Sequence, residues 1–345
     1  MSYQRDYERR VATALVGAGS HAYRNLLPAL NYLPVDLRAI CVRSDAARAQ
    51  QTAAQYGCNA YTDLERMLDE ENIEALIVCL PPAVQAEVAA AALARGKHVW
   101  LEKPPGTSSV QVRQMIDARG ESVAVVGFKK AFMPVTDKAI EIAASPDYGN
   151  LNSMLAIYPT HIPTRAEMQD AGGRIPDWLL NGVHPLSFLL AVGGAPSSVR
   201  AVTGRNGHGS CCVTFGSGVV ANLHLASGPM PMEAYYLYGD HWHLDIYNNN
   251  RVALYRGVPM EYGKTTSFVP DGDDTGAVVW QASNCHASLE NKALFTQGIF
   301  GELNYFFDCI LEQRPAVRGS LEFALDVVRV YEAALESDGN EIMLS

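Results

Sequence analysis

Several features that mark particular classes of protein are missing from this chain of 345 residues. No basic run is longer than the pair Lys129-Lys130, and the formal net charge is −10. Proteins that bind nucleic acid through phosphates usually carry a basic stripe, so we expect no nucleic-acid partner. The most apolar stretch, residues 84–94, is alanine-rich, contains Glu87 and is too short to span a bilayer. A membrane partner is therefore not expected either.

The seven cysteines lack the Cys-x-x-Cys spacing of a metal site. Cys41 and Cys79 lie in apolar runs typical of strands, and the neighbours Cys211 and Cys212 would point to opposite faces of one strand. Residues 1–10 are polar and charged and contain no apolar core of a secretory signal. We expect reduced, mostly buried thiols and a cytoplasmic protein.

The composition, with 48% hydrophobic residues, is that of a globular protein, and the length suggests two domains. Residues 1–127 alternate short apolar runs with helical patterns, which predicts βαβ units and a parallel sheet with helices on both faces. Strands are expected at residues 12–16, 37–42, 75–79, 98–101 and 123–126, and helices at 23–30, 45–56, 64–68, 84–94 and 110–118.

Residues 128–345 show a different pattern, which predicts a second, α+β domain with a large open, mostly antiparallel sheet. Its turns are rich in Gly and Asn, as a meandering sheet requires. Strands are expected at 199–202, 211–215, 219–225, 234–238, 243–246 and 252–255, and helices at 177–190, 301–312 and 321–337. Because a bare sheet face is costly to expose, we expect a homo-oligomer, a dimer or a tetramer, formed through this sheet.

Two histidines of the second domain, His241 and His243, share a strand face with Asp245 and could together bind a metal. A polar sheet face is the favoured interpretation, so we expect no metal.

A glycine-rich turn follows the first predicted strand. Gly17 permits a tight turn, Gly19 lets the backbone approach a pyrophosphate, and Ala22 allows close packing of the helix on the strand. Glycine is common and this pattern alone is weak, but its place between a strand and a helix in a βαβ unit makes it specific. The first domain is therefore predicted to be a Rossmann domain that binds a dinucleotide.

The end of the second strand discriminates between NAD(H) and NADP(H). NAD-binding proteins place an acidic residue here for the ribose 2′-OH, but this chain has Val42, followed by Arg43 and Ser44. A guanidinium and a hydroxyl can bind a 2′-phosphate, so we expect NADP(H) to be preferred, with NAD(H) possible. In the alternative, Arg43 is a solvated loop residue and Asp45 reaches the ribose.

Together with the glycine turn, several motifs resemble the Gfo/Idh/MocA oxidoreductases, and the resemblance runs along the whole chain. The most specific motif is Glu102-Lys103-Pro104 at the end of the strand expected at residues 98–101. The matching segments are residues 17–22, 78–82, 96–104, 126–128 and 181–185, with Glu302-Leu303 and Arg314-Pro315 near the end. The cofactor contacts expected from these motifs and from the second strand are Gly17, Gly19, Ser20, His21, Ala22, Arg43, Ser44, Leu80, Pro81, Glu102 and Lys103.

The resemblance implies hydride transfer between the nicotinamide and a carbinol or carbonyl carbon, commonly of a sugar or cyclitol. Lys103 matches the family's lysine at the reacting oxygen, and His184 matches its usual proton donor and acceptor. The chemistry agrees, because a fixed ammonium stabilises the negative charge that develops on oxygen and an imidazole can supply the proton.

One departure concerns the position four residues before His184, where the family usually carries Asp and this chain has Leu180. Asn181 and Asp177 lie three and seven residues before the histidine, and both offsets fall on its face of a helix. We favour Asn181 as the group that assists His184 and keep Asp177 as the alternative; a helix bulge could also move Asn181 into the usual position.

Further residues are candidates for substrate contact. Tyr158 and His161 end the first strand of the second domain, Trp178 could stack on a sugar ring, and Lys129 comes shortly after the strand expected at residues 123–126. Core packing for Trp178 and a surface position for Lys129 are the alternatives. The altered surroundings of His184 also keep open a reductase of a non-sugar carbonyl or imine, and a regulator that binds NADP(H) without turnover.

Overall fold

The chain folds into two compact units in this computed structural model. The first unit comprises Met1–Lys129 and Ile299–Leu325, and the second comprises Lys130–Gly298 and Asp326–Ser345. The first unit thus includes a segment from near the C-terminus in addition to the N-terminal region. The structure describes residues 7–164, 167–168, 175–228, 232–240, 242–256, 262–264, 277–282 and 293–344.

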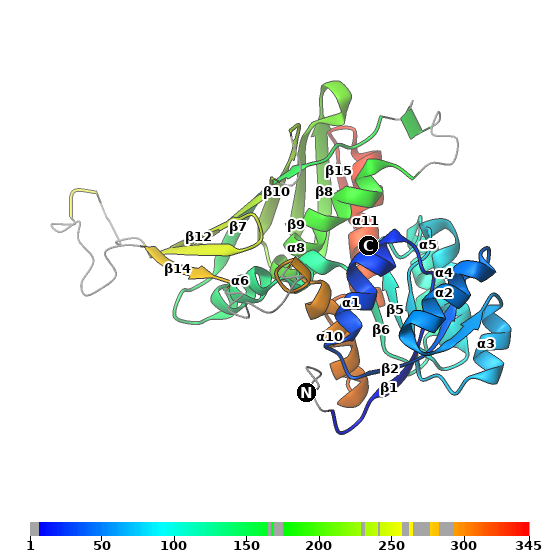
Figure 1. Cartoon of the computed structure of the whole chain (residues 1–345). Helices are drawn as coiled ribbons and strands as arrows, with labels where there is room; N and C mark the ends of the chain where they lie inside the picture. Colours follow the sequence, from blue (N-terminus) through cyan, green and yellow to red (C-terminus); the bar gives the residue numbers. More distant parts are fainter. Residues whose placement is uncertain are drawn as a thin grey trace. The chain divides into compact units, whose positions relative to one another are not determined.

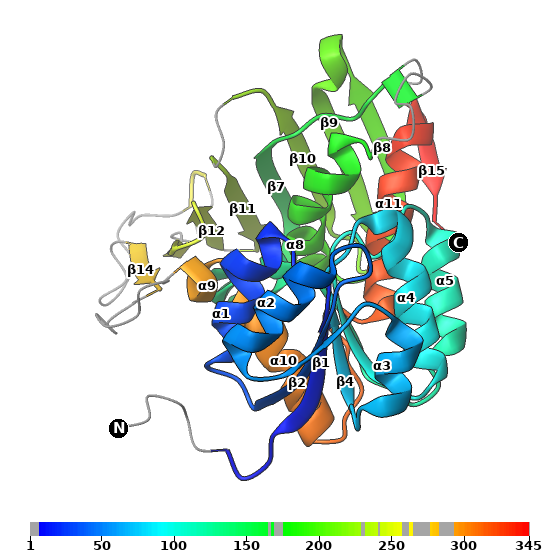
Figure 2. The ribbon, with the colours of Figure 1, turned by 45° about the vertical axis from the view of Figure 1, so that its right-hand side comes forward.

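The first unit contains a parallel sheet of six strands in the order β3-β2-β1-β4-β5-β6 (Figure 1). Helix α10 lies on one face of this sheet and α4 and α5 lie on the other (Figures 1 and 2). The strands are β1 (Val11–Val16), β2 (Val35–Cys41), β3 (Asn59–Tyr61), β4 (Ala75–Val78), β5 (His98–Glu102) and β6 (Ala124–Gly127). The helices are η1 (Ala22–Leu26), α1 (Leu27–Leu30), α2 (Ala46–Tyr56), α3 (Leu64–Glu70), α4 (Pro82–Ala94), α5 (Ser109–Ala118) and α10 (Ile299–Leu311). This strand order is that of a Rossmann domain, whose ligands bind at the carboxyl ends of the strands.

Local sequence explains where these elements begin. Asp45 and Asp63 cap α2 and α3, each accepting a backbone N–H three residues later at 2.9 Å. All four residues of β4 are buried, as expected for a strand with helices on both sides. The edge strand β3 was not expected, because two of its three residues are exposed and carry no apolar pattern.

The second unit contains a nine-stranded sheet in the order β14-β13-β12-β11-β7-β10-β9-β8-β15. Every neighbouring pair is antiparallel except β7 and β10, which are parallel. The strands are β7 (Leu151–Pro159), β8 (Pro196–Thr203), β9 (Gly209–Phe215), β10 (Val220–Ala226), β11 (Ala234–Gly239), β12 (Trp242–Tyr247), β13 (Arg251–Arg256), β14 (Ala277–Gln281) and β15 (Glu341–Met343). The remaining helices are η2 (Lys129–Phe132), α6 (Pro134–Ala144), η3 (Trp178–Gly182), α8 (Val183–Gly193), η4 (Arg205–Gly207), α9 (Ala293–Thr296) and α11 (Leu321–Ser337). The expected fold class is confirmed, with α6 and the edge strands β14 and β15 added to the predicted elements.

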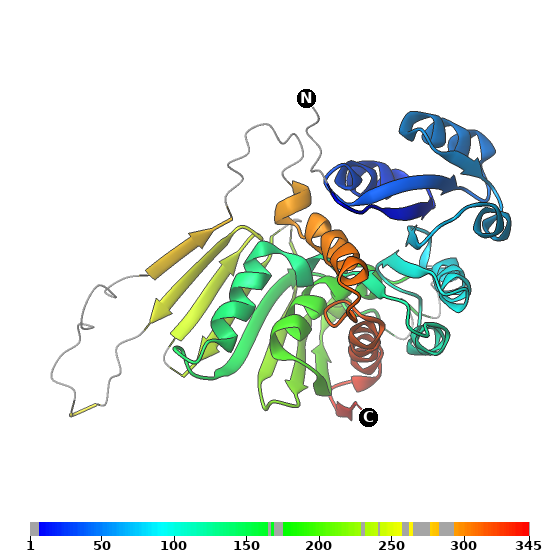
Figure 3. The same cartoon turned by 90° about the horizontal axis from the view of Figure 1, so that it is seen from below.

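One face of this sheet carries the core of the second unit. Helices α6 and α8 lie on the same face (Figure 3), and the rings of Phe188 from α8 and Tyr235 from β11 stack at 3.9 Å. On the opposite face Tyr255, His243 and Tyr238 form a row of stacked rings. His243 thus lies in an aromatic row, while His241 is outside the described residues. Among the described residues, no group of three His, Cys, Asp or Glu side chains is placed to hold a metal ion.

No helix in the described part of the chain combines the length and the apolar character needed to cross a membrane.

Candidate functional site

The turn after β1 has the geometry that lets a ligand approach the backbone closely. Gly17 has φ +96°, and a Cβ atom at this position would lie 2.2 Å from the carbonyl oxygen of Cys79. A Cβ atom on Gly19 would instead have no neighbour within 4 Å, so this glycine faces open space. Ala22 is completely buried, consistent with close helix packing. The turn therefore fits a pyrophosphate, with Gly17 fixing the backbone and Gly19 leaving room for the ligand.

Glu102 connects this turn to the end of β5. Its Oε1 lies 2.6 Å from Nε2 of His21, and its Oε2 accepts the backbone N–H of Lys103. The other ring nitrogen of His21 lies 3.1 Å from the side-chain amide of Asn25. The structure thus brings together His21, Glu102 and Lys103 from the sequence prediction, at the carboxyl edge of the sheet.

Sequence reasoning missed Gln85, which is completely buried near the start of α4. Its Oε1 accepts the backbone N–H of Leu80 at 3.2 Å, and its Nε2 donates to the carbonyl oxygens of Glu102 and Pro104, the latter at 2.9 Å. One amide therefore holds the loop after β4 against the loop that carries Lys103. A glutamine in an alanine-rich helix gives no sign in the sequence that it turns inward.

Lys103 lies in a partly buried cluster of charged groups. Burial lowers the pKa of its ammonium, while Glu102 and Glu302 raise that pKa and Lys129 lowers it. Such perturbed groups are common at functional sites, because catalysis needs charge where solvent is scarce. Glu302 was quoted in the sequence only as part of a matching motif and was not assigned a role.

The end of β2 bears on cofactor preference. Arg43 and Ser44 are exposed and lie in the turn after this strand. Asp45 caps α2 through the backbone N–H of Arg48, whose guanidinium also lies 3.4 Å from the same carboxylate. The Asp45 carboxylate thus serves as a helix cap, next to the exposed Arg43 and Ser44.

In the second unit, His184 lies near the start of α8 and is 7% exposed. Its ring centroid is 6.4 Å from that of Tyr158, which is also buried. Burial raises the pKa of the Tyr158 phenol, as do the nearby carboxylates of Glu233 and Asp177, so the phenol stays protonated and can donate a hydrogen bond. An imidazole and a phenol are therefore neighbours.

The helix before His184 contains the bulge considered from the sequence, because η3 is a π-helical turn. A π turn contains one residue more than an α-helical turn. The residue on the same helix face as the family's Asp therefore lies further than four residues before His184, and Asn181, only three residues before it, does not take that position. Asn181 Nδ2 donates to Asp177 Oδ1, and Asp177 Oδ2 accepts from Thr160 Oγ1 at 2.9 Å and lies 3.5 Å from His161 Nδ1. The two candidates thus form one hydrogen-bonded pair.

Two other sequence candidates lie elsewhere. Trp178 is completely buried, packs against Gly182 and donates its indole N–H to the carbonyl oxygen of Tyr331 at 3.2 Å, so no ring face is open to a sugar. Lys130, which follows the candidate Lys129 in the sequence, is buried in an ion pair with Glu233. Its neighbour Lys129 is partly buried and belongs to the first unit.

Comparisons with known proteins agree with this geometry. Residues 11–129 match the model of the oxidoreductase family with an NAD-binding Rossmann fold, GFO_IDH_MocA. The chain is 30% identical over 246 residues to dTDP-3,4-didehydro-2,6-dideoxy-alpha-D-glucose 3-reductase of Streptomyces antibioticus, covering 67% of this chain and 73% of the relative. It is 27% identical to D-xylose 1-dehydrogenase (NADP(+)) 2 of Haloferax volcanii, over 55% of this chain and 59% of that protein.

Solved structures share the whole fold. A dehydrogenase from Chromobacterium violaceum superimposes with a TM-score of 0.80 at 21% identity, covering 96% of both chains. Levoglucosan dehydrogenase in complex with NADH and L-sorbose gives a TM-score of 0.79 at 18% identity, covering 98% of this chain and 99% of that one. The glycine turn, the Glu102-Lys103-Pro104 segment and the extent of these matches show that the chain belongs to the Gfo/Idh/MocA family of oxidoreductases.

Proposed function

We propose that this protein transfers a hydride between NADP(H) and a carbinol or carbonyl carbon of a sugar-like or cyclitol substrate. The first unit binds the dinucleotide and the second binds the substrate. The observation that carries the proposal is the cluster at one edge of the Rossmann sheet, where Glu102 contacts His21 of the open glycine turn and accepts the backbone N–H of Lys103.

The bound nicotinamide supplies or accepts the hydride, and the chain's own residues handle charge and protons. Lys103 stabilises the negative charge that develops on the reacting oxygen, and His184 gives or takes its proton. The Asp177–Asn181 pair binds substrate hydroxyls or orients the imidazole, and Tyr158 donates a hydrogen bond to the substrate.

Replacement of the two central residues tests this chemistry. Lys103→Met and His184→Ala should each lower kcat by about 10²–10⁴-fold, because each removes a group that acts in the transition state. Lys138→Met, which removes a partly buried lysine of α6 paired with Glu141, is the control and should leave kcat unchanged. Full activity in either test variant would contradict the assignment.

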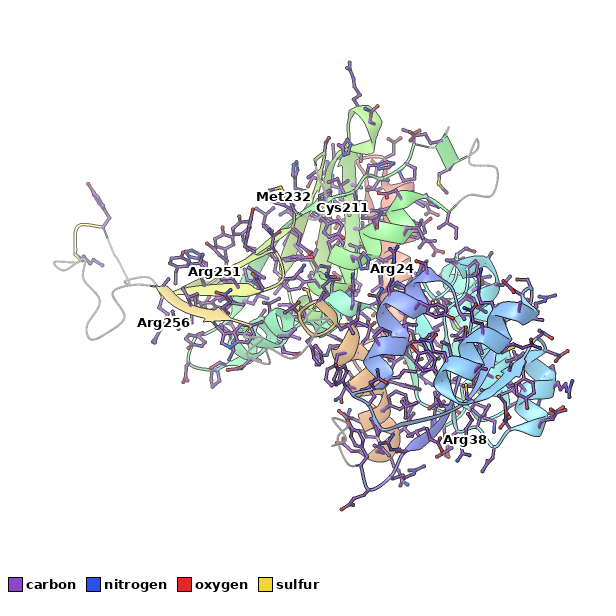
Figure 4. The ribbon with its side chains drawn as sticks, viewed as in Figure 1. Arg24, Arg38, Cys211, Met232, Arg251 and Arg256 are labelled. Carbon is purple, nitrogen blue, oxygen red and sulfur yellow. The ribbon has the colours of Figure 1, made fainter. Side chains whose placement is uncertain are left out.

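The preference for NADP(H) rests on the turn after β2. Arg43 and Ser44 are exposed there, so a guanidinium and a hydroxyl are available to an adenosine 2′-phosphate, while Asp45 serves as a helix cap. Arg43→Ala should weaken NADPH binding by about 1.5–3 kcal/mol and leave NADH binding unchanged. Arg38→Ala, at an exposed arginine of β2 paired with Asp36 (labelled in Figure 4), is the matched control. An unchanged NADPH dissociation constant for Arg43→Ala would exclude the proposal.

The names of relatives support a sugar-like substrate, since they include reductases of a dTDP-linked keto-sugar and a xylose dehydrogenase. A non-sugar carbonyl is the second candidate, because a relative from Mus musculus is a trans-1,2-dihydrobenzene-1,2-diol dehydrogenase. A panel of keto-sugars, free sugars, cyclic ketones and imines, assayed with NADPH and NADP⁺, separates the two. NADPH binding without turnover on any of them would favour a regulator.

We further propose a homo-oligomer formed through the sheet face opposite α6 and α8. Tyr238, Tyr247 and Tyr255 are 43%, 49% and 37% exposed on that face, and Arg251 from the same face is labelled in Figure 4. So broad an aromatic surface indicates a protein interface, and a second copy buries the same face by two-fold symmetry. Sedimentation equilibrium should show a dimer or tetramer, and Tyr247→Glu should shift it toward monomer. A monomeric wild-type protein would refute the interface.

A further inference from the structure

The contact between His21 and Glu102 places a titratable side chain at the turn that fits a pyrophosphate. His21 belongs to the glycine-rich turn that ends at Ala22, and its side chain is 39% exposed. Its Nε2 lies 2.6 Å from Oε1 of Glu102, the last residue of β5. Neither the glycine pattern nor hydride transfer requires an imidazole at this position.

The second ring nitrogen of His21 shows which form of the imidazole the structure describes. The amide nitrogen of Asn25, four residues further on, lies 3.1 Å from Nδ1 and donates to it, so Nδ1 carries no proton. The ring is therefore neutral, and its Nε2–H donates to the carboxylate of Glu102. An asparagine can serve either state of the ring, because rotation of its amide presents the oxygen to an Nδ1–H instead. His21 can thus accept a proton without losing a hydrogen bond.

The electrostatics of this contact change when a dinucleotide binds. A pyrophosphate diester is a dianion, and at the glycine turn it meets the carboxylate of Glu102, whose side chain is only 12% exposed. Repulsion between like charges is strong where water is largely excluded. A proton on His21 converts its contact with Glu102 into an ion pair and compensates the carboxylate that faces the phosphates. Bound phosphates and Glu102 therefore both favour the imidazolium.

Other titratable groups surround Glu102 and its neighbours. They come from the ends of β4, β5 and β6 and from α10, and are Cys79, Lys103, Lys129 and Glu302. Burial raises the pKa of the Cys79 thiol to about 12, so this thiol stays neutral. Burial also raises the pKa of Glu302 well above its ordinary value, so its carboxyl is a second group that can exchange a proton. An experiment has to assign the proton to one residue.

We propose that His21 is a positioning residue for the dinucleotide: it takes up a proton when the pyrophosphate binds, and its imidazolium holds Glu102 at the glycine turn. This role rests on the proposed function and adds a proton to the binding step. A charge-assisted hydrogen bond is shorter and about twice as strong as a neutral one. Since Glu102 also accepts the backbone N–H of Lys103, the Lys103 loop is held more firmly in the loaded protein than in the free protein.

Proton uptake is measured by titration calorimetry of the full chain with NADPH at pH 7.5. In buffers of different ionisation enthalpy, the slope of the observed heat gives the number of protons taken up. The wild type should take up about 0.5–1 proton, and His21→Gln, which keeps a donor to Glu102, should take up close to none. His98→Asn is the matched control, because it alters the other histidine of the first unit, at the opposite end of β5, and it should behave like the wild type.

The same proton makes the affinity depend on pH. Between pH 7 and pH 8 the dissociation constant of NADPH should rise about three- to tenfold in the wild type and stay nearly level in His21→Gln. Binding without proton uptake would overturn the proposal. An uptake that survives in His21→Gln would also overturn it, since the proton then belongs to Glu302 or to the 2′-phosphate of the ligand. If neither NADPH nor NADH binds, the proposed function fails as well.

Nuclear magnetic resonance reads the state of the ring directly and covers the case in which His21→Gln does not fold. The wild type is labelled with ¹⁵N in its histidine rings, and the His21 signals are assigned through the backbone. At pH 7.5 the free protein should show the neutral ring with its proton on Nε2, and the NADPH complex should show the imidazolium. A neutral His21 ring in the complex would refute the proposal.

Discussion

Replacing Gln85 by leucine tests whether one buried amide holds the two loops of the cofactor site together. The substitution keeps the volume roughly constant and removes the acceptor for Leu80 N–H and the donor for the carbonyl oxygens of Glu102 and Pro104. Each buried backbone group left without a partner costs about 1–3 kcal/mol. Water that enters the site will satisfy part of this demand, so we expect a loss of about 3–5 kcal/mol. A domain in the upper part of the usual range of about 5–15 kcal/mol still folds after such a loss.

Two measurements check this expectation. Urea unfolding followed by circular dichroism gives the change in free energy, and fluorescence titration with NADPH should show weaker binding because the Lys103 loop is released. Gln51→Leu, at an exposed position of α2, is the control and should stay within about 0.5 kcal/mol. Gln85→Glu keeps the acceptor for Leu80 but loses the donor, so it should also weaken binding. A loss below about 1 kcal/mol in Gln85→Leu would show that the reasoning fails.

Three further substitutions probe other parts of the fold. Gly17→Ala should abolish dinucleotide binding, because its Cβ would lie 2.2 Å from a carbonyl oxygen; Gly57→Ala, also at positive φ but facing open space, should cost only about 1–2 kcal/mol and retain binding. Burial lowers the pKa of His98, whose Nδ1 accepts the N–H of Val123 at 2.9 Å. The neutral imidazole therefore stabilises the fold at pH values above its unfolded-state pKa, and this stabilisation is lost as the pH falls toward the folded-state pKa. His98→Asn should therefore lose less stability than the wild type between pH 7.5 and pH 5.5 in urea unfolding, and equal losses would contradict this. Lys130→Met should destabilise the protein by about 3–5 kcal/mol, since it leaves a buried carboxylate uncompensated, and a normal melting temperature would count against a buried pair.

The sequence predicted most of the sheet in the first unit because its strands are continuous apolar runs. The strand at 75–79 is an example, with every residue of β4 buried on both faces. Edge strands lack this signal: β3 and β15 expose most of their side chains and are defined by backbone pairing with a neighbour. A local sequence pattern cannot identify a strand that is extended only because it pairs with a neighbouring strand.

The same limit applies to the candidate site. The residues from the glycine turn and the Glu102-Lys103 segment could be predicted, because their motifs follow strands and the carboxyl ends of parallel strands meet at one edge. Gln85 could not be assigned, because its role depends on burial and on partners up to 19 residues away in the sequence. A bulge before His184 was considered from the sequence only as an alternative, because nothing in the local pattern fixes a π turn, and this turn decides which upstream side chain shares the helix face of His184.

The path of the chain between the two units has a consequence for biosynthesis. The polypeptide crosses from one unit to the other three times, after residues 129, 298 and 325. While the ribosome is still making the second unit, the sheet face that α10 will cover is exposed to water, including the apolar backs of β5 and β6. The nascent N-terminal half is therefore vulnerable to aggregation until about nine-tenths of the chain has emerged, and a fragment that ends before α10 stays vulnerable.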